Sequence, residues 1–369
     1  MRLINKVILI SSLLFFITPF SIAKENMHVV FINPDPPESP FWGNMTTFMQ
    51  AVAKDLDIQF DVIYGDRSRF KNKNNFMKAI TQENKPDYII TIFQESTGPS
   101  QLSAAEAAGV KVFVINTDIP SRVKAELGSP REKYSSWIGH LWPDDKQGGE
   151  LLAKTLLAQR SSLSTKTNAP FKMFGISGSH ESSPALYRNN GIKAVLSEQK
   201  EVQLEQIVYA QWGEQEAYKK TNKLLQRYPD TSLIFCAGGA MTSGVIKAIQ
   251  ESAKTPGEDL LLGSFDWSES NISKIKSGTL AASVGGHFMD GGWSLILLYD
   301  YHHGIDFKDT IGVEIHNPLS VITLDNVNEY QAILKQEYWQ KINFKKMTKT
   351  LGGTELPYNL TIDALGNNE

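Results

Sequence analysis

The sequence predicts an α/β protein of two domains, each with a doubly wound parallel sheet. Short apolar runs rich in β-branched and aromatic residues alternate with amphipathic helical stretches along the chain. This rhythm starts near Met27, stops at the polar linker "AQRSSLSTKTNAP" (residues 158–170), and then begins again. Strands that alternate with helices of this length form βαβ units whose parallel sheets are covered on both faces. The 369 residues also exceed one ordinary core, so two domains are expected.

Residues 1–23 have the features of a cleavable secretory signal. Arg2 and Lys6 precede the apolar run "VILISSLLFFITPF", and small residues follow at Ser21 and Ala23. The run is short for a membrane span, so we expect export to the periplasm and cleavage after Ala23. An uncleaved membrane anchor is the alternative interpretation. A lipid anchor is not supported, because no Cys ends this segment.

Each half of the remaining chain contains strand-like runs that alternate with helical patterns. In the first half, strands are expected at residues 28–33, 60–64, 88–93 and 111–116, and helices at 42–56, 74–84 and 100–109. In the second half, strands are expected at 171–177, 204–210, 232–238 and 260–265, and helices at 184–198, 215–228 and 241–252. The repeated rhythm, without a convincing sequence repeat, indicates two domains of similar architecture. Further along, "EYWQKINF" (337–344) is typical of a short helix.

Charge and cysteine content narrow the class of partner. The formal net charge is −3, and this slightly acidic balance argues against a surface for nucleic acid or for an anionic membrane. The single cysteine, Cys236, lies in the apolar run "SLIFCAGGA", and we interpret it as a small buried hydrophobe. The seven histidines lack metal-ligand spacing, so no metal and no cofactor are expected. The expected partners are small molecules or other proteins, and the protein itself is expected to be a monomer.

The residues directly after the strands are the first candidates for a binding site. Open parallel sheets bind ligands beyond the carboxyl ends of their strands, and in two facing domains these ends form the walls of a cleft. Aromatic rings and charged or amide groups recur together there. Proteins hold sugars in this way, with rings on the apolar faces and carboxylates or guanidinium groups on the hydroxyls. The positions are Ser39, Phe41, Trp42, Phe93, Gln94, Glu95, Asn116 and Asp118 in the first half, and Glu181, Arg188, Gln211, Trp212, Gly238, Gly239, Asp266, Trp267 and His287 in the second.

Each of these residues also has a purely structural interpretation. Phe41 and Trp42 begin a helix and are equally suited to fastening it to the sheet. The aspartates that follow strands are of a type that caps turns, and Arg188 on a helix flank is of a type that forms surface salt bridges. Trp212 is harder to explain as core, because its strand has already ended. The binding hypothesis therefore depends on the whole set.

Five short motifs share their layout with one known family. "SPFW" (39–42) is similar to a turn Asn-Pro-Phe-Phe whose aromatics enclose a sugar, "VFVINTDIP" (112–120) to a strand ending in Asp-Arg, and "LLGSFDW" (261–267) to a Gly-Phe-Asp signature. "SGSHESSPALYRNNGIKAVL" (177–196) is similar to a loop and helix with a ligand-binding Arg, and "GTLAASVGGHFMDGGW" (278–293) to a last crossover. The chain thus resembles the type I periplasmic solute-binding proteins of sugar uptake, the ribose- and galactose-binding group. This resemblance covers nearly all of the chain after the signal and implies the periplasmic-binding-protein-like I fold.

The resemblance implies a sugar site between the domains. The implied ligand-binding residues are Ser39, Phe41, Trp42, Gln94, Asp118, Arg188, Trp212, Asp266 and His287. The chain departs from the family pattern at several of these places: Ser39 replaces an Asn, Ile119 an Arg, Gly238 and Gly239 an Asn-Asp pair, and Gly286 or His287 a Gln. The departures leave the identity of the ligand open. Four further residues are candidates for rebuilding the polar set: Glu95, Glu181, His140 and Trp267.

The family crosses between its two domains three times, which implies a hinge. The crossings are expected near Leu141, near His287 and near Pro318. The first domain then comprises residues 24–141 plus 288–317, and the second comprises residues 142–287 plus 318–369, with an extended tail.

The implied function is that of a periplasmic substrate-binding protein. It would capture a sugar or sugar-like molecule by hinge closure and deliver it to the inner-membrane permease of an ABC transporter. The alternative is a receptor that presents its ligand to the periplasmic domain of a membrane histidine kinase or to a chemoreceptor.

An enzyme is not expected. "GISGS" near Ser177 does not form the Gly-x-Ser-x-Gly elbow, and no phosphate loop or dinucleotide fingerprint follows a strand. A carbohydrate-acting enzyme that uses Asp118 and Asp266 as its carboxylate pair is a minor alternative. A transcriptional repressor with a related core is disfavoured by the export signal, which leads straight into the first strand.

Overall fold

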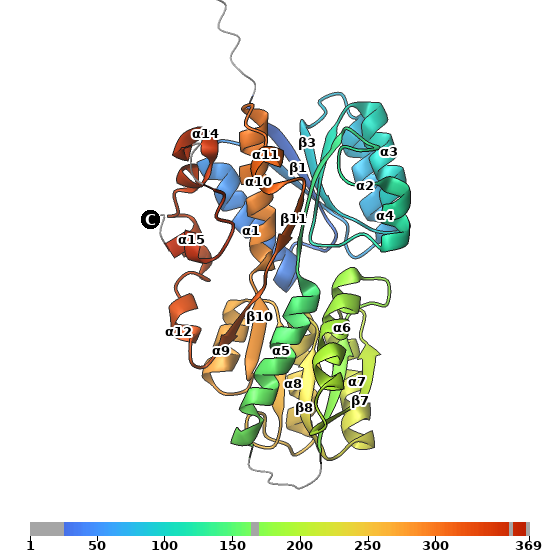
Figure 1. Cartoon of the computed structure of the whole chain (residues 1–369), viewed down its shortest axis with the longest axis vertical. Coiled ribbons are helices and arrows are strands. Elements are labelled where there is room, and N and C mark those ends of the chain that lie inside the picture. The colour runs from blue at the N-terminus through green and yellow to red at the C-terminus, as the bar shows by residue number, and fades with distance from the viewer. Residues whose placement is uncertain (1–25, 164–169, 354–356, 367–369) are drawn as a thin grey trace, which may run out of the picture.

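The computed structural model describes residues 26–163, 170–353 and 357–366. Two α/β domains lie one above the other along the long axis of the molecule (Figure 1). Each contains a six-stranded sheet, so the predicted fold class is confirmed. The signal-peptide prediction lies outside the described residues. Within them, no helix is both long and apolar enough to cross a membrane.

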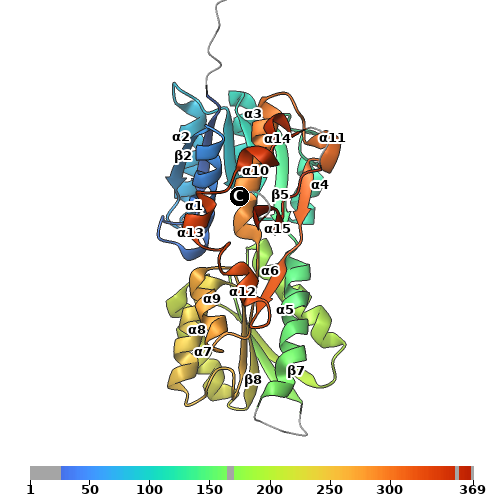
Figure 2. The same cartoon turned by 90° about the vertical axis from the view of Figure 1, so that its left-hand side faces the viewer.

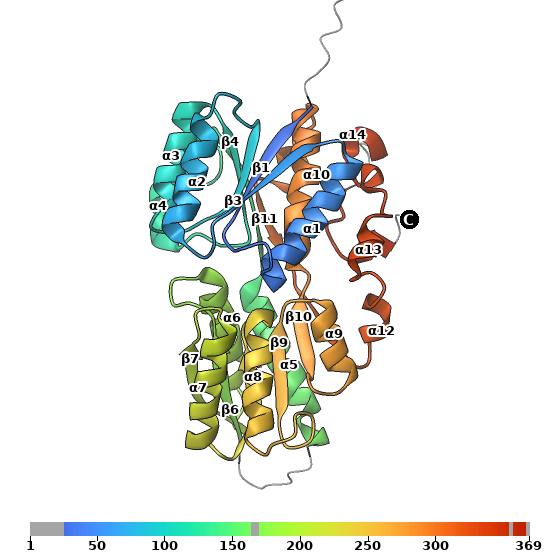
Figure 3. The same ribbon diagram turned by 180° about the vertical axis from the view of Figure 1, so that it is seen from behind.

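The first domain is built on a parallel sheet with the order β11-β5-β4-β3-β1-β2. Alternate residues of its strands enter two different cores: Val29 and Phe31 pack beneath α1 and α10, whereas Val30 and Ile32 pack beneath α2 and α3. Figures 1 and 3 show these helices on opposite faces. The strands are β1 (His28–Asn33), β2 (Gln59–Tyr64), β3 (Tyr88–Ile92), β4 (Lys111–Ile115), β5 (Trp137–Pro143) and β11 (Glu314–Asn317). The helices are α1 (Pro40–Asp55), α2 (Arg69–Thr81), α3 (Gly98–Ala108), α4 (Ser121–Leu127), α10 (Asp290–His302) and α11 (Lys308–Ile311).

The second domain has the sheet order β12-β10-β9-β8-β6-β7. One edge differs from the all-parallel expectation, because β12 runs antiparallel to β10. The strands are β6 (Phe171–Ser177), β7 (Val202–Tyr209), β8 (Thr231–Cys236), β9 (Leu261–Phe265), β10 (Ala282–Gly285) and β12 (Ser320–Thr323). The helices are α5 (Asp145–Gln159), α6 (Ser183–Ser197), α7 (Glu214–Arg227), α8 (Gly239–Glu251) and α9 (Glu269–Lys276), with the 3-10 turns η1 (Arg160–Ser162) and η2 (His287–Met289). Cys236 is fully buried, as the sequence predicted.

Local sequence explains where the helices near the boundary between the domains begin. Pro40 is the first residue of α1, where its fixed φ and missing N–H cost nothing. The helix predicted near residue 74 begins earlier, at Arg69, because the Ser68 side chain accepts a hydrogen bond from the Lys71 amide and caps it. These two starts place Phe41 and Arg69 at the carboxyl ends of β1 and β2.

The chain passes between the two sheets three times. The crossings join β5 to α5, β10 to α10, and β11 to β12. The first and third lie side by side: the Asp144 amide donates to the Asn317 carbonyl (2.7 Å), and the Gln147 side chain bonds both the amide and the carbonyl of Leu319. Two of the three crossing segments, the first and the third, are therefore joined to each other by hydrogen bonds.

The tail after residue 326 runs along the hinge side of both domains (Figure 2). Its elements are α12 (Val327–Tyr330), α13 (Gln336–Trp339), η3 (Phe344–Met347), α14 (Lys349–Gly352) and α15 (Asp363–Gly366). Tyr330 packs on Trp267 of the second domain, with ring centroids 5.3 Å apart. Trp339 instead enters the core of the first domain, 5.3 Å from the Phe48 ring and 5.2 Å from the Phe288 ring.

A buried carboxylate holds the end of the tail against α10. Asp300 accepts hydrogen bonds from the amides of Lys349 and Thr350, from the Thr350 hydroxyl and from the Tyr358 hydroxyl. The sequence assigned residues 318–369 to the second domain. These contacts lead us to propose that the part after about residue 336 belongs to the first.

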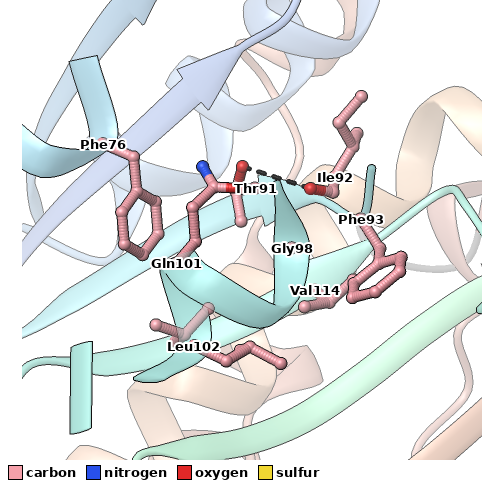
Figure 4. Close-up of a pocket in the computed structure, with 9 residues that line it drawn as sticks. Phe76, Thr91, Ile92, Phe93, Gly98, Gln101, Leu102 and Val114 are labelled. Atoms are coloured by element: carbon pink, nitrogen blue, oxygen red, sulfur yellow. Dashed lines mark hydrogen bonds between the residues drawn. The ribbon is translucent and has the colours of Figure 1, made fainter. Parts of the chain in front are cut away.

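A small void lies inside the first domain between the sheet and α3 (Figure 4). Its volume is about 10 Å³, and Phe76, Phe93, Gln101 and Leu102 are among the residues that line it. This is about the space that one water molecule needs, so the void is a packing feature and not a ligand site.

Candidate functional site

The carboxyl ends of the two sheets meet at the boundary between the domains, and side chains from both domains touch there. Arg69 at the start of α2 forms an ion pair with Glu181, which follows β6. Tyr187 of α6 lies close to Asp118, which follows β4; burial and then this carboxylate raise the pKa of Tyr187. The structure therefore shows the two domains in contact across their boundary.

A buried polar cluster lies in the second domain beneath these contacts. Arg188 is 3% exposed, and its Nε donates to Asp145 Oδ1 at 2.7 Å. One Nη donates to the Ala237 carbonyl at 2.7 Å, and the other lies 3.1 Å from His287 Nε2. The guanidinium plane stands over the Phe265 ring, 4.2 Å from its centroid. Arg188 is thus a buried, fixed cation. It does not form the surface salt bridge that was the alternative interpretation of its sequence position.

Asp266 completes this cluster. Its Oδ1 lies 3.2 Å from His287 Nε2 and 4.0 Å from Arg188, and its Oδ2 accepts from the Gly239 amide at 2.7 Å. Burial alone would raise the pKa of Asp266, but the hydrogen bond and charge of His287, with Arg188, hold it below its ordinary value. Asp266 is therefore a carboxylate that can accept hydrogen bonds from a ligand's hydroxyl groups.

Two aromatic residues from α1 lie at the same boundary. The Phe41 ring is 4.7 Å from the His287 ring and meets Trp42 edge-on at 5.0 Å. Trp42 also approaches Phe31 of β1, at 6.3 Å. Both residues are only partly buried. Phe41 is thus the ring that joins the polar cluster, whereas Trp42 is shared between the boundary and the core of the first domain.

The Trp212 ring also lies at this boundary, and neighbouring glycines leave the space that it occupies. A Cβ on Gly178 would come within 2.1 Å of the Trp212 ring, and one on Gly238 within 3.2 Å. A side chain at Gly178 would therefore displace the indole. Gly238 and Gly239 looked like lost polar contacts in the sequence. In the structure both glycines have a packing or bonding role: Gly238 faces the Trp212 ring, and the Gly239 amide donates a hydrogen bond to Asp266.

Several residues directly after the strands have a left-handed backbone conformation. They are Asn116 (φ 66°), Gln211 (φ 52°), Trp212 (φ 58°) and Asp266 (φ 71°). Asn and Asp adopt this region with modest strain, but a bulky residue such as Trp212 does so rarely. Such strain gathers at binding sites, where it directs side chains into a cleft.

The structure does not bring every predicted residue to the cluster. The Ser39 side chain donates to Asp35 Oδ2 at 2.6 Å and lies at the start of α1. The Gln94 carbonyl accepts from the amides of Thr97 and Gly98, where α3 begins. Ser39 and Gln94 therefore remain predicted ligand residues with structural contacts of their own.

The structure also shows the contacts of the four further residues that were candidates for binding the ligand. Glu95 pairs with Arg122 on the surface of the first domain, and Glu181 pairs with Arg69 across the boundary. His140 is buried and its Nε2 lies 2.9 Å from the Thr117 carbonyl. Burial lowers the pKa of His140 to about 3. Trp267 is buried, and its Nε1 donates to the Ser283 carbonyl.

Sequence reasoning missed three residues of the site: Arg69, Asp145 and Tyr187. Asp145 stands in the run "WPDDKQGG", where two adjacent acidic residues at a helix start are most simply interpreted as caps. Tyr187 is the neighbour of Arg188, which was identified. The start of α2 was placed too late to draw attention to Arg69. Asp145 follows β5 closely and could have been included in a survey of strand ends, whereas Tyr187 lies too far along α6 to stand out from its neighbours.

A larger cavity, of about 130 Å³, lies at the hinge behind this cluster. Its walls come from the second and third crossings and from the tail, including Gly286, His287, Asp290, Pro318 and Thr361. Asp290 is buried, and its Oδ1 accepts from Asn317 Nδ2 at 2.8 Å. Burial, the largest cause, raises the pKa of Asp290 to about 8; the Asn317 bond opposes this shift and the charge of Asp145 adds to it.

This raised pKa predicts a pH-dependent stability. Between about pH 4 and pH 8 the folded state holds a proton on Asp290 that the unfolded state has released. The free energy of unfolding should therefore fall as pH rises through this window, by up to about 1.4 kcal/mol per pH unit from this group. Asp290→Asn should lose that part of the slope, as measured by urea unfolding from pH 5 to pH 8. Asp309→Asn on the surface is the control, and parallel curves for Asp290→Asn and wild type would contradict the assignment.

No group of three or more His, Cys, Asp or Glu side chains within the described residues has a geometry that could hold a metal ion. The chemistry of the site is that of hydrogen bonding and ring stacking. Carboxylate, guanidinium, imidazole, phenol and indole groups meet at one boundary, which is a donor and acceptor set suited to a polyhydroxylated ligand.

Comparison with known proteins agrees with this geometry. A family model described as "Periplasmic binding protein domain" matches residues 29–300. A solved periplasmic sugar-binding protein from Pseudomonas fluorescens is similar over 92% of this chain and 99% of its own, with 26% identity and a TM-score of 0.83. The arabinose ABC transporter binding protein from Shewanella sp. ANA-3, bound to L-arabinofuranose, matches 84% of this chain and 96% of its own (17% identity, TM-score 0.72). A solute-binding protein from Actinobacillus succinogenes 130z with bound D-allose matches 82% and 99% (15% identity, TM-score 0.70). The last two similarities show the shared fold.

Proposed function

The chain belongs to the periplasmic binding protein family, and from this membership we propose that it captures a sugar or sugar-like molecule between its two domains. The observation that carries the proposal is the set of Phe41, Trp212, Arg188, Asp266 and His287. They come from both sides of one boundary and combine rings with a carboxylate that is only 14% exposed and a buried guanidinium. We propose that the ligand stacks on the rings and that its hydroxyls bond the charged groups.

Hinge closure is the proposed mechanism. Contacts to both domains exist together only when the domains approach, so a ligand that makes them shifts the population toward the closed form. The Arg69–Glu181 and Tyr187–Asp118 contacts join the same two domains and add to closure. The exposed ion pair contributes little by itself, on the order of 1 kcal/mol or less. Most of the closing free energy must therefore come from the ligand.

We propose the permease of an inner-membrane ABC transporter as the partner that reads the closed form. The support comes from the solved relatives, whose descriptions name ABC transporters for the Shewanella and Actinobacillus proteins. A receptor that presents its ligand to a membrane sensor uses the same closure, and uptake of labelled sugar by cells with and without the protein would separate the two roles. Loss of uptake on deletion of the gene supports transport.

A carbohydrate-acting enzyme is less compatible with the geometry. Asp118 follows β4 of the first domain and lies close to Tyr187, whereas Asp266 follows β9 of the second and pairs with His287. A hinge between two carboxylates cannot keep the fixed separation that glycoside hydrolysis requires. Turnover of a sugar by the purified protein would overturn this conclusion.

The proposed function is tested by titrating the purified protein with L-arabinose, D-galactose, D-allose and D-tagatose. We expect saturable one-to-one binding of at least one of them by calorimetry, with a smaller radius of gyration in X-ray scattering when it is bound. Trp212→Ala should weaken that binding about tenfold or more, because the variant loses both the apolar area that the indole covers and a stacking contribution of about 0.5–1.5 kcal/mol. Trp142→Ala, on β5 and facing His140 and His316, is the matched control. Equal affinity of the two variants would contradict the site.

A further inference from the structure

The orientation of Arg188 depends on a residue outside its own strand-and-helix unit. A guanidinium carries five N–H groups in one plane. In Arg188 the single Nε–H donates to Asp145, and the Nη groups face Ala237, His287 and Asp266. Phe265 covers one face of the plane. Asp145 is thus the partner at the Nε edge, and its bond sets which way the Nη groups point.

Helix packing brings Asp145 within reach. Asp145 is the first residue of α5, and Arg188 lies on α6. A Cβ on Gly149 would come within 2.2 Å of the Arg188 carbonyl, and one on Gly191 within 2.1 Å of the Lys146 carbonyl. The two glycines therefore let the backbones of α5 and α6 touch. This close approach places the Asp145 carboxylate beside the guanidinium with both groups buried.

We propose that Asp145 is a positioning residue of the ligand site, which holds the Arg188 guanidinium so that its Nη groups face the cleft. This inference rests on the proposed function. Asp145 belongs to the first crossing between the domains, directly after β5, so the hinge itself fixes the cation of the site. Without Asp145 the buried Nε–H has no acceptor, and the guanidinium turns toward Asp266, the nearest other carboxylate.

The test compares three variants of the full-length mature protein. Asp145→Ala removes the acceptor, and we expect the dissociation constant for the tightest-binding sugar of the panel above to rise about 10- to 100-fold. Asp145→Asn keeps an oxygen at the same place and should recover much of the lost affinity. Asp144→Ala is the matched control: Asp144 caps α5 through the Gln147 amide, so its loss should lower the unfolding midpoint and leave sugar affinity within about threefold.

A second measurement separates positioning from a general structural effect. The Nε–H signal of Arg188 in nuclear magnetic resonance should be protected from exchange in wild type and in Asp145→Asn, and lost in Asp145→Ala. Equal loss of affinity in Asp144→Ala and Asp145→Ala would overturn the inference, as would an unchanged Nε–H signal. If no sugar binds wild type, the proposed function fails. The Nε–H signal of the variant without an acceptor still decides whether Asp145 orients Arg188. If Asp145→Ala does not fold, Asp145→Leu, which has a similar shape and no acceptor, takes its place.

Discussion

Replacing Asp266 with Asn is expected to weaken sugar binding by about 10- to 150-fold, since a hydrogen bond to a charged group contributes about 1.5–3 kcal/mol. Asp266 is the carboxylate that remains ionised in the cluster, because His287 and Arg188 lower its pKa. Asn has nearly the same shape and can still accept from the Gly239 amide, so the fold should survive. Calorimetry with the tightest-binding sugar measures the change directly.

The control for this variant is Asp259→Asn. Asp259 lies in a surface turn of the second domain, where it accepts from the Thr255 amide. Its replacement removes the same charge from the same domain without touching the cluster, and affinity should stay within about threefold of wild type. An Asp266→Asn protein with wild-type affinity would mean that the ligand binds elsewhere.

Trp339→Ala is expected to lower the free energy of unfolding by about 3–5 kcal/mol. Trp339 has no exposed surface, packs against Phe48 and Phe288, and donates from Nε1 to the Ile333 carbonyl at 2.7 Å. Removing the indole leaves a cavity between α1, η2 and the tail. Urea unfolding monitored by circular dichroism measures the loss.

Leu351→Ala is the matched control in the same tail. Leu351 is 52% exposed, so its truncation should change the free energy of unfolding by about 0.5 kcal/mol or less. If Trp339→Ala cost no more than Leu351→Ala, the tail would not be part of the first domain's core. Sugar affinity of Trp339→Ala at low temperature, where it is folded, should stay near that of wild type.

Much of the fold could be predicted from the sequence, because periodicity reports local burial. Buried parallel strands such as "YIITI" and amphipathic helices such as α7 carry their own signal, and their predicted ranges differ from the observed ones by only a few residues. The antiparallel pairing of β12 with β10 leaves no such signal, since four residues at a sheet edge look alike in either direction. Tertiary contacts decide it.

The candidate site likewise contains some residues that the sequence indicates and others that only the structure reveals. Strand ends are recognisable in a sequence, so the sequence predicts Phe41, Trp212 and Asp266 as ligand residues. Asp145 was missed because its contact with Arg188 arises from the touching backbones of α5 and α6, and Arg188 and Gly191 are distant from Asp145 in the chain. The purpose of Gly238 was likewise hidden, because a glycine that makes room for an indole resembles a lost polar residue until the indole is placed.

The anchoring of the tail has a consequence for how the protein is made. The first domain lacks an edge strand, β11, and a core helix, α10, until residues 290–317 have been synthesised, and its aromatic core lacks Trp339 until later still. In a chain that is synthesised amino terminus first, the second domain can finish its sheet core earlier, once β12 has been made. The domain that begins the chain is therefore completed last, and its unfinished hydrophobic face is the surface that stays exposed longest during folding.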